Sequence, residues 1–291
     1  MNISIIGAGK VGCALAFGFY NNGFNIAGVF SRSVESHNYL CTKLGKNFDN
    51  NLVEAVRSSD VIFISVSDND IEKVAEDIAL KVRPQDIRSK IFLHLSGALT
   101  TGALNSLSKL GAFTGSLHPV QTFADKENGW KCLYNIYYGF EGCEKARECA
   151  QDIIKTFNGS IIYIKKEDKP LYHAAACIIS NYTVTLSYMA GEILAQIGLD
   201  RETASRAFLP LIKNTVSNLD IHGSVNALTG PISRGDHKVL EEHLKSLSTL
   251  DPKICEVYKD LGLMTIEVAL KKGTLVRENA EKLNKLLKEC H

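Results

Sequence analysis

The chain has 291 residues, of which 45% are hydrophobic and 22% are charged, a composition typical of a globular protein with about two domains. The 33 Lys and Arg residues balance 32 Asp and Glu residues, so no excess charge favours nucleic acid or an anionic membrane. No apolar run reaches the ~18 to 20 residues of a membrane helix, and Met1 leads directly into a predicted strand instead of a signal peptide. We therefore expect a cytoplasmic protein that binds neither nucleic acid nor membrane.

The first residues combine a predicted strand over 2–6, the spacing Gly7-x-Gly9-x-x-Gly12 and an apolar helix over 13–20. This order is typical of a dinucleotide-binding turn, in which successive glycines permit the turn, the approach of a pyrophosphate and the packing of helix on strand. The N–H groups of the helix N-terminus would bind the phosphates. The predicted cofactor-binding residues are Gly7, Gly9, Lys10, Val11 and Gly12. The alternative is an ordinary glycine turn.

A second strand, predicted over 26–30, ends in Ser31-Arg32-Ser33. An Asp or Glu at this position would bind the ribose 2′-hydroxyl of NADH, whereas a cation between two hydroxyls suits the 2′-phosphate of NADPH. The sequence therefore predicts NADP(H) as the cofactor, with Ser31, Arg32 and Ser33 binding it. The alternative is an ordinary surface arginine.

Strands and helices alternate up to residue 165. Further helices are predicted over 34–44, 52–56, 71–80, 104–110 and 144–157, and strands over 60–66, 91–95, 112–117, 134–141 and 160–164, with an extended piece at 46–48. This pattern predicts a Rossmann-like α/β domain over residues 1–165, with a mostly parallel sheet and helices on both faces. Since ligands bind at the carboxyl ends of strands in such sheets, Val66, Ser67 and Asp68 should border the nicotinamide ribose.

The alternation ends in the charged segment 165–170, where Pro170 is placed to begin a helix. Helices are predicted over 171–197, 201–219, 237–249, 252–272 and 276–289. We therefore predict an all-α C-terminal domain over 166–291 that binds the substrate. The length and apolar character of the helix at 171–197 favour a homodimer formed through this domain.

Candidate substrate-binding residues follow two of the later strands. Ser96 and Gly97 follow the strand at 91–95, and His118 precedes a proline at the end of the strand at 112–117. We expect all three to contact substrate, Ser96 to contact the cofactor as well, and His118 to act in catalysis. The alternative for His118 is a histidine that bonds to backbone carbonyls.

The helix at 171–197 carries a polar stripe. His173, Cys177, Ser180 and Asn181 share one face of an otherwise apolar helix. Burying such groups without partners costs about 2–7 kcal/mol, so they bond internally or face a wet pocket. We predict that His173 and Asn181 act in catalysis and that Ser180 and Asn181 bind substrate. The alternatives are a structural stripe and a dimer contact.

A loop is predicted over 227–236, because Gly-Pro and Arg-Gly-Asp interrupt the helices there. Arg234 could bind a substrate carboxylate through its two-pronged guanidinium, and Thr229 could add a donor. The alternative is a capping loop in which Asp236 caps the next helix and Arg234 is a surface residue.

The eight cysteines are scattered, without a Cys-x-x-Cys pair or a Cys/His cluster at zinc spacing. We expect mostly buried, reduced thiols and no metal site.

Together these motifs resemble a family of NADP-binding oxidoreductases that have a Rossmann-like N-terminal domain and a helical C-terminal domain of formerly unknown function. The matching segments are Gly7–Gly12, Leu95–Leu99, Gly115–Asp125, Tyr172–Ala176, Ser180–Tyr182 and Leu228–Asp236. More broadly the chain is similar to ketopantoate reductase, pyrroline-5-carboxylate reductase and the β-hydroxyacid dehydrogenases, which share this two-domain plan and are often dimeric.

Orthodox ketopantoate reductases carry Lys-x-x-x-Asn-x-x-x-Asn on the first helix after the cofactor domain, with the Lys as general acid. Here the same spacing reads His173, Cys177 and Asn181, so only the last residue matches. An alternative class of ketopantoate reductases is similar to the present family, and the resemblance therefore implies ketopantoate as the leading substrate.

We therefore expect an enzyme that transfers hydride from NADPH to a small 2-oxo acid, most simply 2-dehydropantoate (ketopantoate) in pantothenate biosynthesis. His173 would donate the proton and Asn181 would orient the carbonyl oxygen. Arg234 would hold the carboxylate. The alternatives are a reductase of an imine such as pyrroline-5-carboxylate or of a deazaflavin, and a non-enzymatic NADP(H) sensor.

Overall fold

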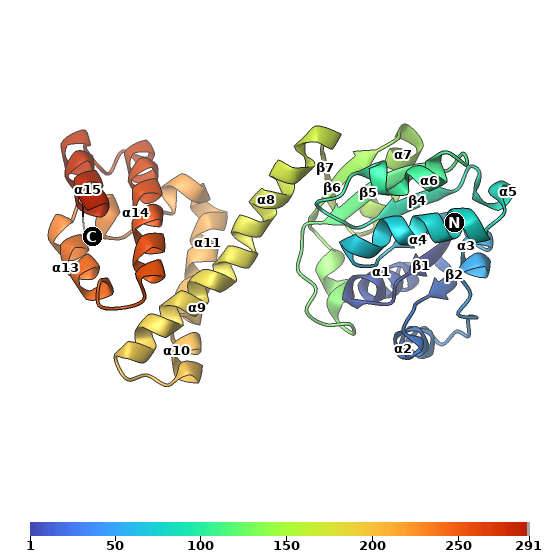
Figure 1. Cartoon of the computed structure of the whole chain (residues 1–291), viewed down its shortest axis with the longest axis horizontal. Helices are drawn as coiled ribbons and strands as arrows, with labels where there is room; N and C mark the ends of the chain where they lie inside the picture. The colour runs from blue at the N-terminus through green and yellow to red at the C-terminus, as the bar shows by residue number, and fades with distance from the viewer. Residues whose placement is uncertain (290–291) are drawn as a thin grey trace. The chain divides into compact units, whose positions relative to one another are not determined.

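The computed structural model describes residues 1–289, apart from the side chains of Arg201 and Ser205. By packing the chain divides into two compact units, Met1–Asn181 and a second unit that begins at Tyr182. Both units are traced in Figure 1 from blue at the N-terminus to red at the C-terminus. Within residues 1–289, no helix is both long and apolar enough to cross a membrane.

The first unit contains one sheet, with seven strands among the described residues. The strands are β1 (Asn2–Ile6), β2 (Asn25–Phe30), β3 (Val61–Ile64), β4 (Ile91–His94), β5 (Phe113–Pro119), β6 (Tyr137–Gly142) and β7 (Ser160–Tyr163). They lie in the order β2-β1-β3-β4-β5-β6-β7, and every neighbouring pair is parallel except β5 and β6. The predicted mostly parallel Rossmann-like sheet is confirmed.

Helices lie between these strands along the chain and pack on both faces of the sheet, except α8 (Lys169–Ile179), which follows the last strand (Figure 1). They are α1 (Lys10–Asn21), α2 (Val34–Leu44), α3 (Leu52–Arg57), α4 (Asp68–Lys81), α5 (Pro84–Ile87), α6 (Asn105–Ser108), α7 (Glu144–Thr156) and α8 (Lys169–Ile179), with 3-10 turns η1 (Thr101–Leu104), η2 (Gly129–Leu133) and η3 (Lys166–Asp168). The extended piece predicted at 46–48 forms no strand.

The period-two alternation of the strands divides the core of the first unit into two clusters. Val61 and Phe63 of β3 pack in one cluster with α1, α2 and α7, while Ile62 and Ile64 pack in the other with α3, α4 and α6. Adjacent strand residues point to opposite faces, so an unbroken apolar strand needs helices on both sides. This burial fixes the register of the central strands.

The register also aligns the carboxyl ends of the parallel strands. Ile6 pairs with Ile64, Ile64 with His94, and His94 with Ser116. The segments that follow these residues therefore emerge along one edge of the sheet, where open α/β sheets bind ligands. This edge positions both the glycine turn and the candidate histidines.

The second unit is helical throughout its described part. Its helices are α9 (Asn181–Gln196, whose first residue closes the first unit), α10 (Arg201–Ala207), α11 (Leu209–Asn226), α12 (Pro231–Arg234), α13 (His237–Leu247), α14 (Pro252–Lys272) and α15 (Arg277–Glu289). Side chains of α12 to α15 form its buried core, with Leu240, Leu244, Ile266 and Leu283 among them. The predicted order of an α/β domain followed by an all-α region is confirmed.

The helix predicted over 171–197 divides at Ser180 into α8 and α9. Helix α8 packs with the first unit, so packing separates the units at 181/182. The predicted boundary at 165 instead marks where strands end and helices take over. The polar stripe that begins at His173 is consequently held by the sheet-containing unit.

Candidate active site

The glycine turn between β1 and α1 has three glycines with different surroundings. Gly7 has φ +105°, and a Cβ there would lie 2.2 Å from the carbonyl oxygen of Ser65. A Cβ on Gly12 would lie 1.9 Å from the carbonyl oxygen of Gly7. For Gly9, by contrast, no described atom lies within 4 Å of such a Cβ. Gly7 and Gly12 are therefore required by the fold itself, whereas Gly9 leaves space that a ligand can enter.

A cavity of about 350 Å³ lies over this turn. Its lining residues come from the ends of β1, β2 and β3, and include Gly7, Gly9, Ser31, Arg32, Ser33, Val66 and Ser67. Gly9 is the N-cap of α1, and no described side chain caps that end of the helix. The N–H groups of Lys10, Val11 and Gly12 therefore stay available to an anion. Of the residues predicted for the nucleotide, Gly7, Gly9, Ser31, Arg32, Ser33, Val66 and Ser67 line this cavity, whereas Lys10, Val11, Gly12 and Ser96 do not. Their roles in binding stay predictions.

Arg32 supplies positive charge at the rim of this cavity. Its side chain is 73% exposed and forms a 2.7 Å ion pair with Asp70, which also accepts from the hydroxyl of Ser67. These two interactions, that of Ser67 first, hold the pKa of Asp70 below its usual range. Such an exposed pair contributes little to stability, so the guanidinium can turn to a phosphate at little cost.

A second cation, Lys126, contacts a residue that lines this cavity. The ammonium of Lys126 donates to the hydroxyl of Ser36, 3.1 Å away, and Ser36 lines the same cavity. Ser33 caps helix α2 by accepting from the backbone N–H of Ser36. Lys126 was missed from the sequence because it comes from the loop after β5, and no local pattern links it to Ser36.

Ser96 and Gly97 form a tight turn after β4. The hydroxyl of Ser96 donates to the carboxylate of Asp68 at 2.8 Å and accepts from the N–H groups of Ala98 and Leu99. Ser96 is only 5% exposed, so its hydroxyl holds the shape of the turn. The predicted contacts of Ser96 with cofactor and substrate stay predictions.

Two histidine rings rest on Gly97. A Cβ on Gly97 would lie 2.7 Å from Nδ1 of His173 and 3.0 Å from Cε1 and Nε2 of His118. The two ring centroids are 6.2 Å apart and the rings lie nearly perpendicular. Only a glycine allows both rings to approach the turn this closely, which explains why Gly97 stands between strand and loop.

His118 lies near the end of β5 and is oriented by α8. Its Nδ1 lies 2.8 Å from the hydroxyl of Tyr172, and Gly139 on β6 leaves room for that hydroxyl. Desolvation first, then the charges of Lys169 and His173, lower the pKa of His118 to about 4. His118 is therefore uncharged near neutral pH.

His173 lies on α8 with its two nitrogens in different surroundings. Nε2 lies 3.6 Å from the thiol of Cys177. Nδ1 is buried against Gly97, and no described residue offers it a hydrogen-bond partner. A buried nitrogen without a partner costs free energy, which is why such an atom points to a missing ligand or solvent molecule.

Both histidines line one cavity of about 550 Å³ within the first unit. Its other polar lining residues are Gln121, Thr122, Tyr172, Cys177, Ser180 and Asn181. The residues of the stripe predicted on the helix thus line a single cavity, and His118 of β5 lines the same cavity. The catalytic and binding roles of these residues stay predictions.

A buried lysine, Lys169, contacts the turn on which both histidine rings rest. Lys169 is 1% exposed, and its ammonium donates to the carbonyl oxygen of Ser96 at 2.9 Å and to the hydroxyl of Ser116. Desolvation lowers its pKa to about 8, against the opposite effects of Glu141 and Asp68. Sequence reasoning missed it because it lies in a run of charged residues, although it precedes His173 by one helical turn.

Thr229 and Arg234 belong to the second unit. Arg234 is exposed at the end of α12, and Asp236 caps α13 by accepting from the backbone N–H of Val239. The capping interpretation of this loop is confirmed, while the predicted role of Arg234 and Thr229 in binding substrate stays a prediction.

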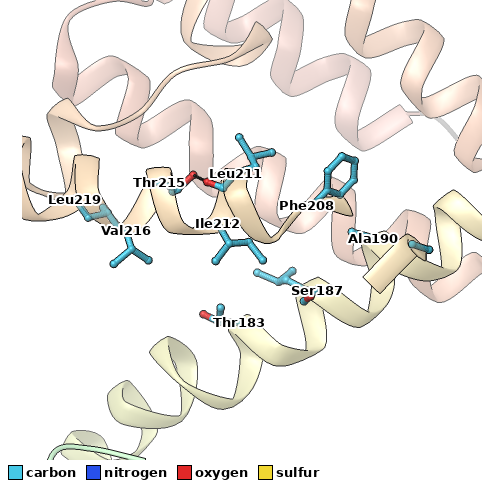
Figure 2. A pocket seen from close by; sticks show the side chains of 11 residues that line it. Thr183, Ser187, Ala190, Phe208, Leu211, Ile212, Thr215, Val216 and Leu219 are labelled. Atoms are coloured by element: carbon cyan, nitrogen blue, oxygen red, sulfur yellow. Dashed lines mark hydrogen bonds between the residues drawn. The ribbon is translucent and has the colours of Figure 1, made fainter. Parts of the chain in front are cut away.

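A separate apolar groove of about 370 Å³ lies in the second unit between α9 and α11. Figure 2 shows Thr183 and Ser187 of α9 opposite Ile212 and Val216 of α11. The groove has no titratable residue in its lining, which makes it unsuited to catalysis.

Within residues 1–289, no group of three or more His, Cys, Asp or Glu side chains could hold a metal. The seven cysteines of this range are free thiols, four of them buried. Cys290 lies outside the described residues.

Two protein families match different parts of the chain. Residues 2–89 match the family described as "NADP oxidoreductase coenzyme F420-dependent", and residues 136–265 match a "Domain of unknown function (DUF2520)". Residues 2–89 are thus similar to the nucleotide-binding part of NADP oxidoreductases, and the prediction of NADP(H) as the cofactor is confirmed.

Solved structures share the fold over nearly the whole chain. A candidate NADP oxidoreductase from Bacteroides fragilis is 25% identical, with 91% of this chain and 98% of that chain covered and a TM-score of 0.72. A reductive aminase from Aspergillus terreus in complex with NADPH is 16% identical, with 97% and 98% covered and a TM-score of 0.64. A pyrroline-5-carboxylate reductase from Coxiella burnetii is 18% identical, with 98% of each chain covered and a TM-score of 0.57.

One curated relative matches a short segment. "Probable arogenate/prephenate dehydrogenase" from Methanocaldococcus jannaschii is 36% identical over 85 residues, which is 28% of this chain. The match spans 19% of that relative's length.

Replacing Arg32 with Gln is expected to raise the KM for NADPH by about 10- to 100-fold, because a charged hydrogen bond contributes about 1.5–3 kcal/mol. The KM for NADH should change little, since NADH has no 2′-phosphate. Arg57→Gln, at an exposed arginine outside the cavity lining, is the matched control. Steady-state kinetics with both nucleotides check this, and an equal loss with NADH would contradict it.

Proposed function

We propose that this protein is an NADPH-dependent reductase that transfers hydride to a small C=O or C=N compound bound beside His118 and His173. The observation that supports this most is the buried, unpaired Nδ1 of His173, a residue that lines one cavity together with His118. Hydride transfer to a carbonyl leaves an alkoxide that needs a proton. The two histidines offer a titratable group near that position.

In this proposal bound NADPH supplies the hydride, and the chain supplies the proton and the orientation. His173 donates the proton to the developing oxyanion, and Asn181 orients the oxygen. Two imidazolium charges 6.2 Å apart would repel each other by about 3 kcal/mol at an effective dielectric constant near 20. Because His118 stays uncharged, His173 can carry the proton without that repulsion.

The first candidate substrate is a small 2-oxo acid, with ketopantoate as the specific case. Its support is the resemblance of the polar helix to that of ketopantoate reductases and the hydrogen-bonding groups of Gln121, Thr122 and Ser180 around the cavity. The cation proposed for the carboxylate is Arg234 of the second unit, assisted by Thr229.

The second candidate is an imine. The described lining of the cavity contains no Lys or Arg side chain, so a neutral or cationic C=N compound fits it without a carboxylate clamp. The names of the Coxiella and Aspergillus relatives point to imines as well. An iminium ion already carries its proton, which would leave His173 to orient the substrate.

The test is NADPH oxidation with ketopantoate, pyrroline-5-carboxylate, a ketone with an amine, and an oxidised deazaflavin. Turnover of ketopantoate, at a rate that NADH does not support, is expected. Turnover of the cyclic imine alone would replace the first candidate by the second, and reduction of the deazaflavin alone would overturn both. Tight binding of NADPH without any turnover would identify a nucleotide sensor instead.

We also propose that a second copy of the chain covers the apolar surface of α9 and α11. Val184, Tyr188, Leu211 and Val216 each expose more than half of their surface, far more than isolated monomers usually show over adjacent helices. Homodimers are the commonest assemblies that bury such a face. Sedimentation equilibrium should give about twice the 32.0 kDa chain mass, and Val216→Asp should give monomer. A monomeric wild type would refute this.

A further inference from the structure

We propose that Lys169 is the positioning residue of the histidine pair, because it holds from below the Ser96–Gly97 turn on which both rings rest. This inference rests on the proposed function of the histidines, but its geometry belongs to the first unit alone. Lys169 does not line the cavity that holds the histidines. It therefore acts through the turn and not on a substrate.

The ammonium of Lys169 is fixed by two strands. It donates to the carbonyl oxygen of Ser96 after β4 and to the hydroxyl of Ser116 on β5. Ser116 itself donates to the same carbonyl oxygen at 3.0 Å. The carbonyl oxygen of Ser96 thus accepts hydrogen bonds from both side chains. Because these bonds fix the peptide group between Ser96 and Gly97, they also fix the position of Gly97. A charge-assisted bond of this kind is stronger than a neutral one.

Lys169 and His173 are on the same helix, four residues apart, so they share one face of α8. Fixing Lys169 to the strand ends fixes the first turn of α8, and His173 comes one turn later. Lys169 therefore fixes the positions of both Gly97 and the imidazole of His173. These two groups lie so close together that there is no room for a Cβ on Gly97. A displacement of about 1 Å in such a contact can change a rate by up to 100-fold.

The charge of Lys169 acts on the same pair. The charged groups that influence Lys169 are Glu141 on β6 and Asp68 at the start of α4. Its positive charge in turn disfavours protonation of His94 on β4 and His118 on β5. His118 also interacts with His173 and Asp68. The charge of Lys169 therefore adds to the desolvation that keeps His118 uncharged.

The hydrogen bonds of Lys169 and of the nearby carboxylate Glu141 go to different groups. The ammonium of Lys169 donates to a carbonyl oxygen and to a hydroxyl. Glu141 instead accepts from the N–H and hydroxyl of Thr101. The lysine charge is thus directed at the turn and the histidines.

The experiment compares wild type with Lys169→Met in the full chain, using NMR titration of the histidine rings and steady-state kinetics. In Lys169→Met we expect the pKa of His118 to rise by about half a unit or more, since one of its depressing charges is removed. The acid limb of the kcat/KM profile should move to higher pH with it. At saturating substrate, kcat should fall by about 10- to 100-fold, with an unchanged Kd for NADPH.

Lys165→Met, at an exposed lysine of the preceding segment, is the matched control and should change neither readout. Lys169→Arg keeps the charge and should keep the low pKa of His118. If Lys169→Met does not fold, Ser116→Ala serves, because it removes one donor to Ser96 and should lower kcat several-fold while the titration of His118 stays as in wild type.

A folded Lys169→Met protein in which kcat and the titration of His118 are both unchanged would overturn the positioning role, as would a Ser116→Ala protein with full activity when Lys169→Met cannot be folded. The titration needs no substrate. If no substrate is turned over by wild type while the titration shifts as expected, the proposed reductase function fails and the coupling of Lys169 to His118 stands.

Discussion

Replacing His173 with Gln is expected to lower kcat by about 100- to 10,000-fold, the range that a positioned acid or base contributes. His173 places Nδ1 against Gly97 and lines the cavity that also contains Asn181. Glutamine is of similar length and can form a hydrogen bond, but it cannot give up a proton near neutral pH. The measurement is turnover of the best substrate of the panel at saturation.

Two controls separate loss of chemistry from loss of structure. NADPH should bind His173→Gln with the Kd of wild type, because the nucleotide cavity does not include α8. His243→Gln is the control variant, because His243 is likewise a helical histidine but lies on α13 in the second unit, where its Nδ1 is 2.8 Å from the hydroxyl of Tyr258. It should keep full turnover. A His173→Gln enzyme that retains the wild-type kcat would rule out His173 as the proton donor for a carbonyl and favour the iminium alternative.

Local patterns were sufficient for the elements that carry the nucleotide. The strand at 2–6, the glycine spacing and the helix that follows are adjacent in the chain, and each glycine has a steric requirement or a free space that the spacing alone predicts. The apolar run at 60–66 likewise required helices on both faces, and β3 has them. Such features depend on neighbours within a few residues, which a sequence displays directly.

The parts of the site that the sequence did not reveal depend on register. Lys169 is one of several charged residues in 165–170, and only the pairing of β4 with β5 brings Ser116 beside the turn it binds. His94 was treated as a strand residue, yet it accepts from the N–H of Ser96 through Nδ1. The spacing of four from Lys169 to His173 was visible, but the position looked like a solvated linker.

The polar stripe that begins on α8 was only partly predictable from the sequence. Helical spacing correctly placed His173, Cys177 and Asn181 on one face, and they share a cavity. It could not indicate that His118 joins them or that Gly97 separates the rings, because those contacts join β5 and the β4 turn to the helix. Periodicity therefore locates a face of a helix, and strand register decides what that face meets.

Gly9→Ala is expected to weaken NADPH binding and Gly12→Ala to destabilise the fold, although both residues lie in one turn. At Gly9 an added Cβ meets open space within the described chain, so the folded protein should lose no more than about 1 kcal/mol, the ordinary cost of Ala at a helix N-cap. The Kd for NADPH should rise by about 10-fold or more, because the methyl group occupies the space through which the pyrophosphate approaches the backbone.

At Gly12 the same methyl group would lie 1.9 Å from the carbonyl oxygen of Gly7, a backbone atom that cannot turn aside. Gly12→Ala should therefore lose about 3 kcal/mol of stability or more, as overpacked cores do, with or without nucleotide. Denaturant unfolding and NADPH titration of the two variants check this pair, each serving as the other's control. If Gly9→Ala binds NADPH as tightly as wild type, the pyrophosphate does not pass over Gly9, and the position of the cofactor on this turn must be revised.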